Sequence, residues 1–382
     1  MRAAALVAPR RIELVDLPPP VLGPHDVRVA PAAVGVCGTD LHIWSGESNF
    51  HLDERGAPVP LEEAPQVLGH EITARVLEVG RAVHDLAPGE RVVVDQGRNC
   101  RSERREPACE YCASGNSHQC ELYREHGITG LPGGFAEELV VPAVNAVRVD
   151  SPLPLRLAAL SEPLACVLHS LDFAGRARTR YALDAGEPSQ RVRTIVILGA
   201  GPAGLLLVQI LRHELRFDGP ILVGEPSAPK RELARQLGAE AYEPAELLDG
   251  LLVRTQGRRA ELLIEASGAG AAFAAIPALI RKQATVLLYG IGHGGASLEL
   301  LNPVQWREAV LVTSVGASGG FDADGRPSVY RRALALLERG TIAVDSLVTH
   351  TYSGLANVAR AFGPDSARPE YVKGVVELES AR

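Results

Sequence analysis

The first part of the chain alternates short β-forming runs with clusters of Pro and Gly. Runs bounded by turn residues in this way predict the short strands of a small β-barrel-like domain. Two long irregular segments, 45–66 and 97–120, interrupt the pattern, and loops of that length inside a compact domain are usually functional or tied down. The expected strands are 27–30, 76–79, 91–95 and 139–142.

The pattern changes in the second part of the chain. A helix is predicted over 155–173, and the segment 174–191, rich in Arg, Gly and Pro, is interpreted as a connector. Apolar strands then alternate with helices, which implies parallel strands joined by crossover helices in a doubly wound sheet. The expected strands are 194–198, 221–224, 262–265 and 285–288, and the expected helices are 205–215, 230–237 and 271–280.

A helix over 329–338 and a strand over 374–378 complete the prediction. This tail either extends the parallel sheet or returns to the first domain. The length of 382 residues suggests two domains, since a domain has ~100–200 residues.

Composition and charge exclude some classes of protein. With 46% apolar and 22% charged residues, the chain resembles an ordinary globular protein. Its net charge of −7 argues against a nucleic-acid partner, because phosphate backbones are bound by clustered Lys and Arg. The basic runs 101–105 and 176–180 are short and are interpreted as solvated loops.

The sequence predicts a cytoplasmic protein without membrane contact. No stretch approaches the ~20 apolar residues that a membrane span requires. The apolar core of the N-terminus is too short for a signal peptide. Because cytosolic thiols stay reduced, we expect the cysteines to be metal ligands or core residues rather than disulfides.

A glycine-rich turn follows the first fully apolar strand and opens a helix. This context confirms a dinucleotide fingerprint, in which glycines allow a tight turn and close approach of a pyrophosphate to the helix N-terminus. A packing turn is the alternative. The predicted cofactor-binding residues of the turn are Gly199, Gly201, Pro202, Ala203 and Gly204.

Glu225 ends the next predicted strand. An acid at this place binds the adenosine ribose hydroxyls and repels a 2′-phosphate, so NAD is favoured over NADP. The alternative is a solvated acid at a strand end. The neighbouring Arg231, also a candidate cofactor-binding residue, and Lys230 leave some room for NADP.

Three separated segments carry metal-binding side chains. Zinc takes Cys, His and carboxylate ligands, and a catalytic site keeps one position open. Each residue alone has a simpler interpretation as a core residue or, for Glu162, as a helix N-terminal acid. Combined with a dinucleotide fingerprint, they indicate a catalytic site. The residues are Cys37, Thr39, Asp40 and His42, then His70 and Glu71, and finally Glu162.

Four cysteines within a loop-rich segment suggest a second, closed zinc site. Cys109, Cys112 and Cys120 have the spacing x2 and x7, and Cys100 precedes them. Unbound thiols and a redox pair are the alternatives. Cys166, on an apolar helix, is expected to be a core residue.

These motifs together resemble the zinc-containing medium-chain alcohol dehydrogenases, in the sorbitol, polyol, glucose and cyclitol dehydrogenase branch. The resemblance covers nearly the whole chain. The matching motifs are Cys37-Gly-Thr-Asp-Leu-His-Ile-Trp44, Leu68-Gly-His-Glu71, Ser161-Glu-Pro-Leu-Ala-Cys166, Ile264-Glu-Ala-Ser-Gly268 and Lys373-Gly-Val-Val376.

The resemblance implies an α/β protein with a GroES-like catalytic domain and a Rossmann domain. The first would comprise 1–170, completed by 317–382, and the second 171–316. It also implies catalytic zinc on Cys37 and His70, with either Glu71 or Glu162 as the carboxylate ligand. A homodimer or homotetramer is usual among similar proteins.

The resemblance also implies roles for three neighbouring residues. Asp40 would accept a hydrogen bond from His70 and fix its tautomer. Thr39 would take the substrate proton and His42 would pass it toward solvent. Zinc would act as Lewis acid beside the nicotinamide, which accepts the hydride.

Two departures from the family pattern stand out. The first cysteine of the second zinc site is usually at the position of Glu106, so Cys100 reaches in, Glu106 ligates, or the site is empty. In addition, 281–285 (Arg-Lys-Gln-Ala-Thr) replaces the usual glycine turn before a strand.

The expected substrate is a small secondary alcohol of a sugar, polyol or cyclitol. The segment 123–130 is similar to one in glucose and cyclitol dehydrogenases, and 45–66 either lines a polar pocket or is a solvated loop. The alternatives are threonine dehydrogenase-like oxidation of an amino alcohol, a zinc-free quinone reductase of the same fold, and a non-catalytic zinc- and NAD-binding relative.

Overall fold

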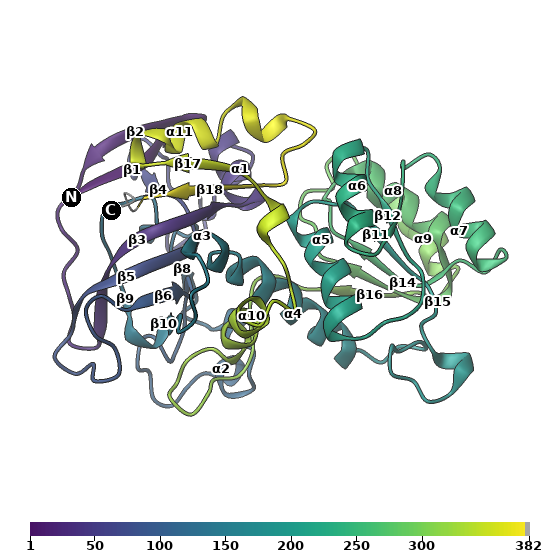
Figure 1. Cartoon of the computed structure of the whole chain (residues 1–382), viewed down its shortest axis with the longest axis horizontal. Coiled ribbons are helices and arrows are strands. Elements are labelled where there is room, and N and C mark those ends of the chain that lie inside the picture. Colours follow the sequence, from purple (N-terminus) through teal and green to yellow (C-terminus); the bar gives the residue numbers. More distant parts are fainter. Residues whose placement is uncertain (379–382) are drawn as a thin grey trace. The chain divides into compact units, whose positions relative to one another are not determined.

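The computed structural model describes residues 1–378 and divides the chain into two compact units (Figure 1). The first comprises residues 1–165, 317–340 and the part from 348 onward, and the second comprises 166–316 and 341–347. The sequence placed the boundary after residue 170 and assigned all of 317–382 to the first unit. In the structure the boundary lies inside helix α4 (Ser161–Arg176).

A mostly antiparallel sheet is the centre of the first unit. Its strand order is β10-β6-β5-β3-β18-β17, with β9 also pairing with β3. A smaller sheet has the order β2-β1-β4, and β7 pairs with β8. The bounds are β1 (Arg2–Ala8), β2 (Arg11–Asp16), β3 (Asp26–Val36), β4 (Gln66–Val67), β5 (Glu71–Val79), β6 (Arg91–Val94), β7 (Gly97–Arg98), β8 (Arg124–Glu125), β9 (Leu139–Pro142), β10 (Ala146–Arg148), β17 (Val348–Ser353) and β18 (Lys373–Glu377).

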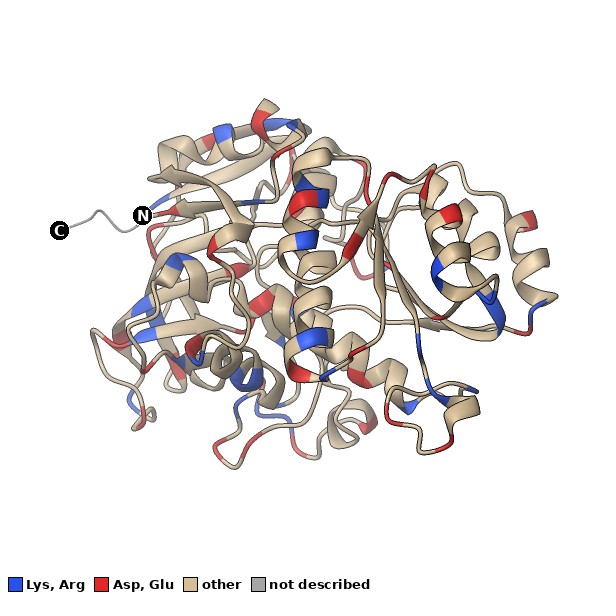
Figure 2. Ribbon diagram, turned by 45° about the vertical axis from the view of Figure 1, so that its right-hand side comes forward, with Lys and Arg blue, Asp and Glu red and all other residues tan. Residues whose placement is uncertain are grey.

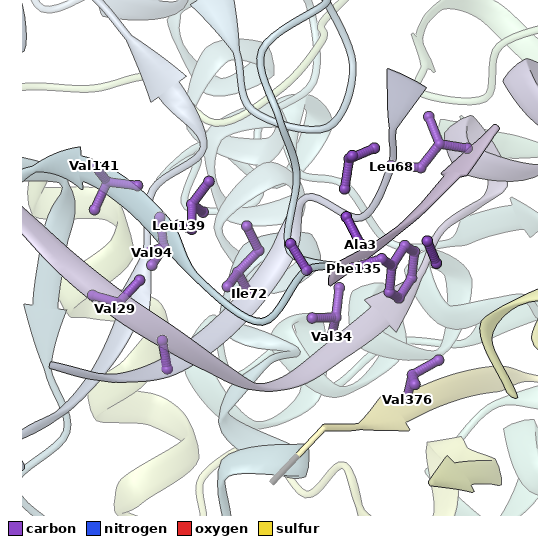
Figure 3. Close-up of a cluster of buried hydrophobic side chains, with 14 of the residues drawn as sticks. Ala3, Val29, Val34, Leu68, Ile72, Val94, Phe135, Leu139, Val141 and Val376 are labelled. Atoms are coloured by element: carbon purple, nitrogen blue, oxygen red, sulfur yellow. The ribbon is translucent and has the colours of Figure 1, made fainter. Parts of the chain in front are cut away.

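The apolar core of this unit is built from small side chains because the chain has few aromatic residues. Val29, Val34, Ile72 and Val376 point into a common interior and are almost completely buried (Figure 3). Burial of one such side chain stabilises the fold by about 1.5–3 kcal/mol. This packing holds β3, β5 and β18 together, and the candidate metal residues Cys37, His70 and Glu71 lie at the ends of β3 and β5.

The C-terminal tail returns to the first unit. Strand β18 pairs antiparallel with β3, so that Gly374 lies opposite Val36. Of the two alternatives left open by the sequence, the return is therefore the one observed.

The second unit is the expected doubly wound parallel sheet, with strand order β13-β12-β11-β14-β15-β16. The order reverses between β11 and β14, and ligands of such sheets bind at the carboxyl ends of strands beside this point. The strands are β11 (Ile195–Leu198), β12 (Ile221–Gly224), β13 (Glu240–Tyr242), β14 (Ala260–Glu265), β15 (Ile280–Leu288) and β16 (Val310–Thr313). The helices are α5 (Pro202–Gln209), α6 (Ala228–Gln236), α7 (Leu247–Thr255), α8 (Gly270–Leu279) and α9 (Leu301–Gln305).

The remaining helices lie outside this sheet. They are α1 (Gly38–Ser45), α2 (Glu110–Ala113), α3 (Leu155–Ala158), α10 (Ser328–Glu338) and α11 (Val358–Ala361). The helix expected over 155–173 is α3 followed by α4. Acidic and basic residues are interspersed along the ribbons of both units (Figure 2).

Two local expectations need correction. The strand expected over 285–288 begins earlier, because 281–285 belongs to strand β15, where Gln283 takes a φ of 58° and the pairing with β14 shifts register. The segment Leu155–Arg176 is long and apolar enough to cross a membrane, contrary to our expectation that no stretch approaches this length. Since 78% of its apolar window is buried inside the protein, it is explained as a core helix.

Candidate metal and dinucleotide sites

Asp40 joins the two segments that carry the first candidate metal ligands. It lies in α1, directly after β3 and Cys37, and is fully buried. Its carboxylate accepts hydrogen bonds from the backbone N–H of Cys37 (2.9 Å) and of Gly69 (3.1 Å). One buried side chain thus holds the Cys37 turn against the turn before β5.

The imidazole of His70 lies beside the same carboxylate. Its Nδ1 is 3.3 Å from Oδ1 of Asp40, and the ring is almost completely buried. Burial disfavours a charged imidazole, but the Asp40 carboxylate and Cys37 outweigh it and raise the pKa of His70 well above its ordinary value. The surroundings of His70 therefore stabilise positive charge at this place.

Glu71 faces the same place from the first residue of β5. Its cross-strand neighbour is Gly35, where a Cβ atom would lie 1.9 Å from Oε2 of Glu71, so glycine is needed to make room. Oε1 accepts a hydrogen bond from Nζ of the buried Lys373. Oε2 is buried without a hydrogen-bond partner, which is a costly state for a carboxylate oxygen unless a cation binds it.

Three ligand atoms converge here. The Sγ of Cys37, a ring nitrogen of His70 and a carboxylate oxygen of Glu71 all lie within 4.8 Å of one another. Thiolate, imidazole and carboxylate form a donor set suited to zinc with an open fourth position. Among residues 1–378, Glu162 is not part of this set.

Glu162 instead belongs to a buried polar network. Its Oε1 accepts a hydrogen bond from Nε2 of Gln96 at 2.9 Å, and Oε1 of Gln96 accepts one from the hydroxyl of Tyr330 on α10. All three side chains are almost completely buried. Because the carboxylate can only accept, it takes the amide N–H₂ of Gln96, and the phenol then donates to the amide oxygen.

Two further acids lie near this network. Glu125, at the end of β8, accepts a hydrogen bond from the Tyr123 hydroxyl at 3.0 Å. Burial raises the pKa of Glu125, while His70, Tyr123 and Gln96 act to lower it. Burial, with smaller contributions from Glu125 and Glu162, raises the pKa of Asp95 to about 7.

The residues expected to move a proton lie on α1. The hydroxyl of Thr39 is 3.9 Å from the Cys37 sulfur. The side chain of His42 is 42% exposed, so it reaches solvent, and its Nδ1 is 2.7 Å from Oε2 of Glu47. The hydrogen bond to His42 lowers the pKa of Glu47.

The four cysteines predicted to form a second site come together. The sulfur atoms of Cys100, Cys109, Cys112 and Cys120 all lie within 4.8 Å of one another, and none forms a disulfide. Cys100 is thus the fourth thiol, and Glu106 is exposed and outside the set. A tetrahedral Cys₄ arrangement is the usual structural zinc site.

Backbone hydrogen bonds prepare one of these thiols for ionisation. The N–H groups of Cys112 and Glu121 lower the pKa of Cys109 to about 6, whereas burial raises the pKa of Cys112 and of Cys120. The N–H of Cys109 donates to the Cys100 sulfur at 3.3 Å. Four buried sulfurs in contact need a cation to become thiolates together.

In the second unit, the glycine turn has the geometry that a pyrophosphate needs. Gly199 has a φ of 103°, which favours glycine. A Cβ at Gly204 would lie 2.0 Å from the Gly199 carbonyl oxygen, whereas one at Gly201 would meet nothing within 4 Å. The turn is therefore tightly packed at Gly204 and has free space at Gly201. Helix α5 begins directly after Gly201, with Pro202 and Ala203.

Glu225 follows β12, and its carboxylate accepts N–H bonds from Ala200 (2.8 Å) and Ser227 (2.9 Å). The guanidinium of Arg231 is buried, bonded to the carbonyls of Glu225 and Pro226 and paired with Glu243 at 2.7 Å. Arg231 therefore braces the turn behind Glu225.

Several residues of these sites were not predicted. Gln96, Glu125, Tyr330 and Lys373 belong to hydrogen-bonded networks, and Glu47 pairs with His42. Glu125 lies in the segment 123–130 that resembles sugar dehydrogenases, and Lys373 begins the C-terminal motif, so both had a local signal. No sequence motif identifies Gln96 or Tyr330, because the two residues come into contact only in the folded chain.

The sequence matches two models of protein families. The alcohol dehydrogenase GroES-like domain matches residues 23–151, and the glucose dehydrogenase C-terminus matches residues 155–378. Together they span both compact units.

Relatives and solved structures agree with these matches. L-threonine 3-dehydrogenase of Pyrococcus abyssi is 30% identical over 353 residues, covering 92% of this chain and 90% of that protein. L-galactonate-5-dehydrogenase of Escherichia coli is 30% identical over 363 residues, covering 94% and 93%. A solved zinc-binding dehydrogenase of Sinorhizobium meliloti, bound to NADP, has a TM-score of 0.78 at 28% identity and covers 98% of both chains.

Proposed function

Because the chain belongs to the zinc-containing medium-chain alcohol dehydrogenase family, we propose that it transfers hydride between NAD and a secondary alcohol of a sugar, polyol or cyclitol. The observation that carries the proposal is the convergence of Cys37, His70 and Glu71, with an unpartnered carboxylate oxygen on Glu71. A non-catalytic relative has no need for this open set of ligands together with Thr39 and His42.

Cys37, His70 and Glu71 are the proposed ligands of the catalytic zinc. Zinc bound there supplies a Lewis acid that stabilises negative charge on the substrate oxygen. Asp40 orients the ring of His70 and holds it close to Cys37. Lys373 holds one oxygen of Glu71 and balances its charge, which leaves the other oxygen for the ion. Glu162 acts in the same site through Gln96 rather than in the ligand set.

We assign the movement of the proton to α1. The Thr39 hydroxyl, beside the Cys37 sulfur, accepts the proton of the substrate hydroxyl and gives its own proton toward His42, whose exposed ring releases a proton to water. The carboxylate of Glu47 holds the His42 ring in place. The site thereby removes a proton while His70 and Glu71 stay buried.

NAD is the proposed cofactor, and it supplies the hydride acceptor. Its pyrophosphate would lie at Gly201 and its ribose hydroxyls at Glu225. The guanidinium of Arg231 is already bonded to two carbonyls and Glu243, so it is not available for a 2′-phosphate. This arrangement supports NAD over NADP, although Lys230 lies nearby.

A second zinc ion on Cys100, Cys109, Cys112 and Cys120 is proposed to have a structural role. The set is closed, with four sulfur ligands and no residue of the proton path nearby in sequence. Its function would be to fix the segment 97–120, which has little regular structure.

The substrate class is supported by the acids around the first site. Glu162 and Gln96 are buried and Glu125 is half-buried, and all three carry polar groups able to bind hydroxyl groups. The alternative is an amino alcohol, supported by the 30% identity to L-threonine 3-dehydrogenase. Carboxylates bind an ammonium group as well as hydroxyls, so the substrate panel described below includes threonine to distinguish the two classes.

A second copy of the chain is the proposed protein partner, and the cytoplasm is the proposed location. Strand β16 is the outer strand of its sheet, and Leu311 on it is 40% exposed. An exposed apolar edge strand is a surface that proteins usually cover. Six free cysteines fit a reducing compartment.

The decisive experiment is a substrate panel assayed with both cofactors. Polyols, aminocyclitols, sugars and threonine are compared by kcat/KM with NAD and with NADP, and Cys37→Ala serves as the inactive control. The proposal predicts turnover of a polyhydroxylated alcohol with NAD. Turnover of threonine alone would favour the alternative, and undiminished turnover by Cys37→Ala would exclude the proposed site.

A further inference from the structure

The segment between Cys100 and Cys109 has no role in either zinc or dinucleotide chemistry apart from its two cysteines. It departs from the usual family spacing, and its basic run 101–105 was interpreted as solvated loop. In the structure, this segment and the loop 320–325 enclose a cavity of about 700 Å³. Both segments belong to the first unit.

Arginine side chains dominate the wall of this cavity. Arg101, Arg104 and Arg105 all line it, together with His25. Arg105 is neutralised by Glu121 at 3.0 Å. Within residues 1–378, neither Arg101 nor Arg104 forms an ion pair: Arg101 lies over the ring of Phe321, and Arg104 donates to Nδ1 of His25 at 3.2 Å.

The acids of the wall do not balance these two charges. Asp324 already pairs with Arg326, at 3.0 Å, and with Arg331. Glu106 is the only lining carboxylate of the described chain that forms no ion pair. In a chain of net charge −7, two arginines that form no ion pair thus line one cavity, beside the thiols of Cys100 and Cys112.

The donor geometry selects among anions. A guanidinium group binds two oxygens of one oxyanion side by side. One carboxylate is therefore saturated by one arginine, whereas a phosphate has enough oxygens for two. The volume exceeds that of a phosphate ion and is within the range of ~300–1,000 Å³ typical of small-molecule pockets. Phe321, Ala108 and Ala113 supply apolar wall for an organic group.

We propose that this cavity is a binding site for a small phosphate monoester, held by Arg101 and Arg104. The site uses none of Cys37, His70, Glu71 or the glycine turn, so the inference does not depend on the proposed dehydrogenase function. The enlarged spacing between Cys100 and Cys109 supplies both arginines.

Isothermal titration of the zinc-loaded protein with phenyl phosphate tests the proposal. Phenyl phosphate has no oxidisable hydroxyl, and saturating NADH excludes it from the glycine turn. The expected result is saturable binding at one site per chain, with phenol giving none. In the double variant Arg101→Gln/Arg104→Gln, loss of two charge-assisted contacts should weaken binding by about tenfold or more.

The matched control is Arg55→Gln/Arg81→Gln, which removes two exposed arginines of the same unit that do not line the cavity. It should bind like the unmodified protein. Zinc content and melting temperature verify that the variants fold, and Arg104→Gln alone replaces the double variant if the latter does not. Absence of saturable binding, or equal affinity in the arginine variants and the control, overturns the proposal.

Discussion

His42 is the residue whose chemistry is most open to a kinetic test, because its ring is in contact with solvent. Replacing His42 by Ala removes the proposed path for the proton that the substrate hydroxyl releases. Hydroxide must then accept this proton directly, and hydroxide is scarce in acidic solution. We therefore predict that His42→Ala slows alcohol oxidation most below neutral pH, measured as kcat/KM against pH. The exposed His84, replaced by Ala, should leave the profile unchanged, and the same profile for both variants would exclude the role of His42.

Asp95 provides a test of the electrostatics around the first site. Burial raises its pKa to about 7 in the folded protein, against ~3.9 in an unfolded chain. A carboxyl group with a raised folded pKa loses its contribution to stability as pH rises through the interval from about 4 to about 7.

Asp95→Asn removes this dependence on pH. At pH 8 it is expected to raise the free energy of unfolding by about 1–3 kcal/mol, and at pH 4 to change it little. Urea unfolding at the two pH values measures the difference. The exposed Asp16→Asn is the control, and an equal effect of Asp95→Asn at both pH values would contradict the assigned pKa.

At the scale of elements, helix α10 acts on the site through one hydrogen bond. The hydroxyl of Tyr330 fixes the amide of Gln96, which in turn donates to Glu162. Tyr330→Phe removes the donor to the amide oxygen of Gln96, so the amide that donates to Glu162 is held at one end only. Loss of one such contact corresponds to about 1–1.5 kcal/mol, so we predict a fall in kcat/KM of about tenfold.

Stability separates this positioning role from a structural one. Tyr181, also buried, is a matched position for Tyr→Phe replacement. Both variants should show similar small changes in melting temperature, while only Tyr330→Phe loses activity. A loss of activity in proportion to stability in both variants would assign Tyr330 a structural role alone.

Elements with a strong local signal could be predicted from the sequence. Strand β12 has the predicted bounds, because its apolar run is continuous and ends at Gly224 and Glu225. Strand β16 was missed because its run is only four residues long and Val312 is its one buried residue. The helix over 155–173 was predicted as one element, but it divides between Ala158 and Ser161.

The same distinction holds for the site. Cys37, His70 and Glu71 stand in short motifs, so their residue types alone marked them. Lys373 bonds to Glu71 from 302 positions away, and this contact depends on β18 pairing with β3. The choice between Glu71 and Glu162 also required geometry, since it depends on which carboxylate oxygen is left unpartnered beside Cys37 and His70.

For the whole molecule, the free edge of the parallel sheet predicts self-association. Leu311 on β16 is exposed, and a Lys at this position would place charge in the proposed interface between copies. We predict that Leu311→Lys lowers the mass measured by light scattering to that of one chain. Leu14→Lys, on the exposed strand β2, should keep the larger mass, and an unchanged mass for Leu311→Lys would exclude this edge as the interface.

The central claim is that Cys37, His70 and Glu71 bind one catalytic zinc ion, in addition to the ion of the four cysteines. Zinc analysis of the purified protein, with Cys37→Ser and the buried Cys166→Ser as a matched pair, tests it most directly. The account predicts two zinc ions per chain in the unmodified protein and in Cys166→Ser, and one in an inactive Cys37→Ser. Two zinc ions and full activity in Cys37→Ser would contradict it.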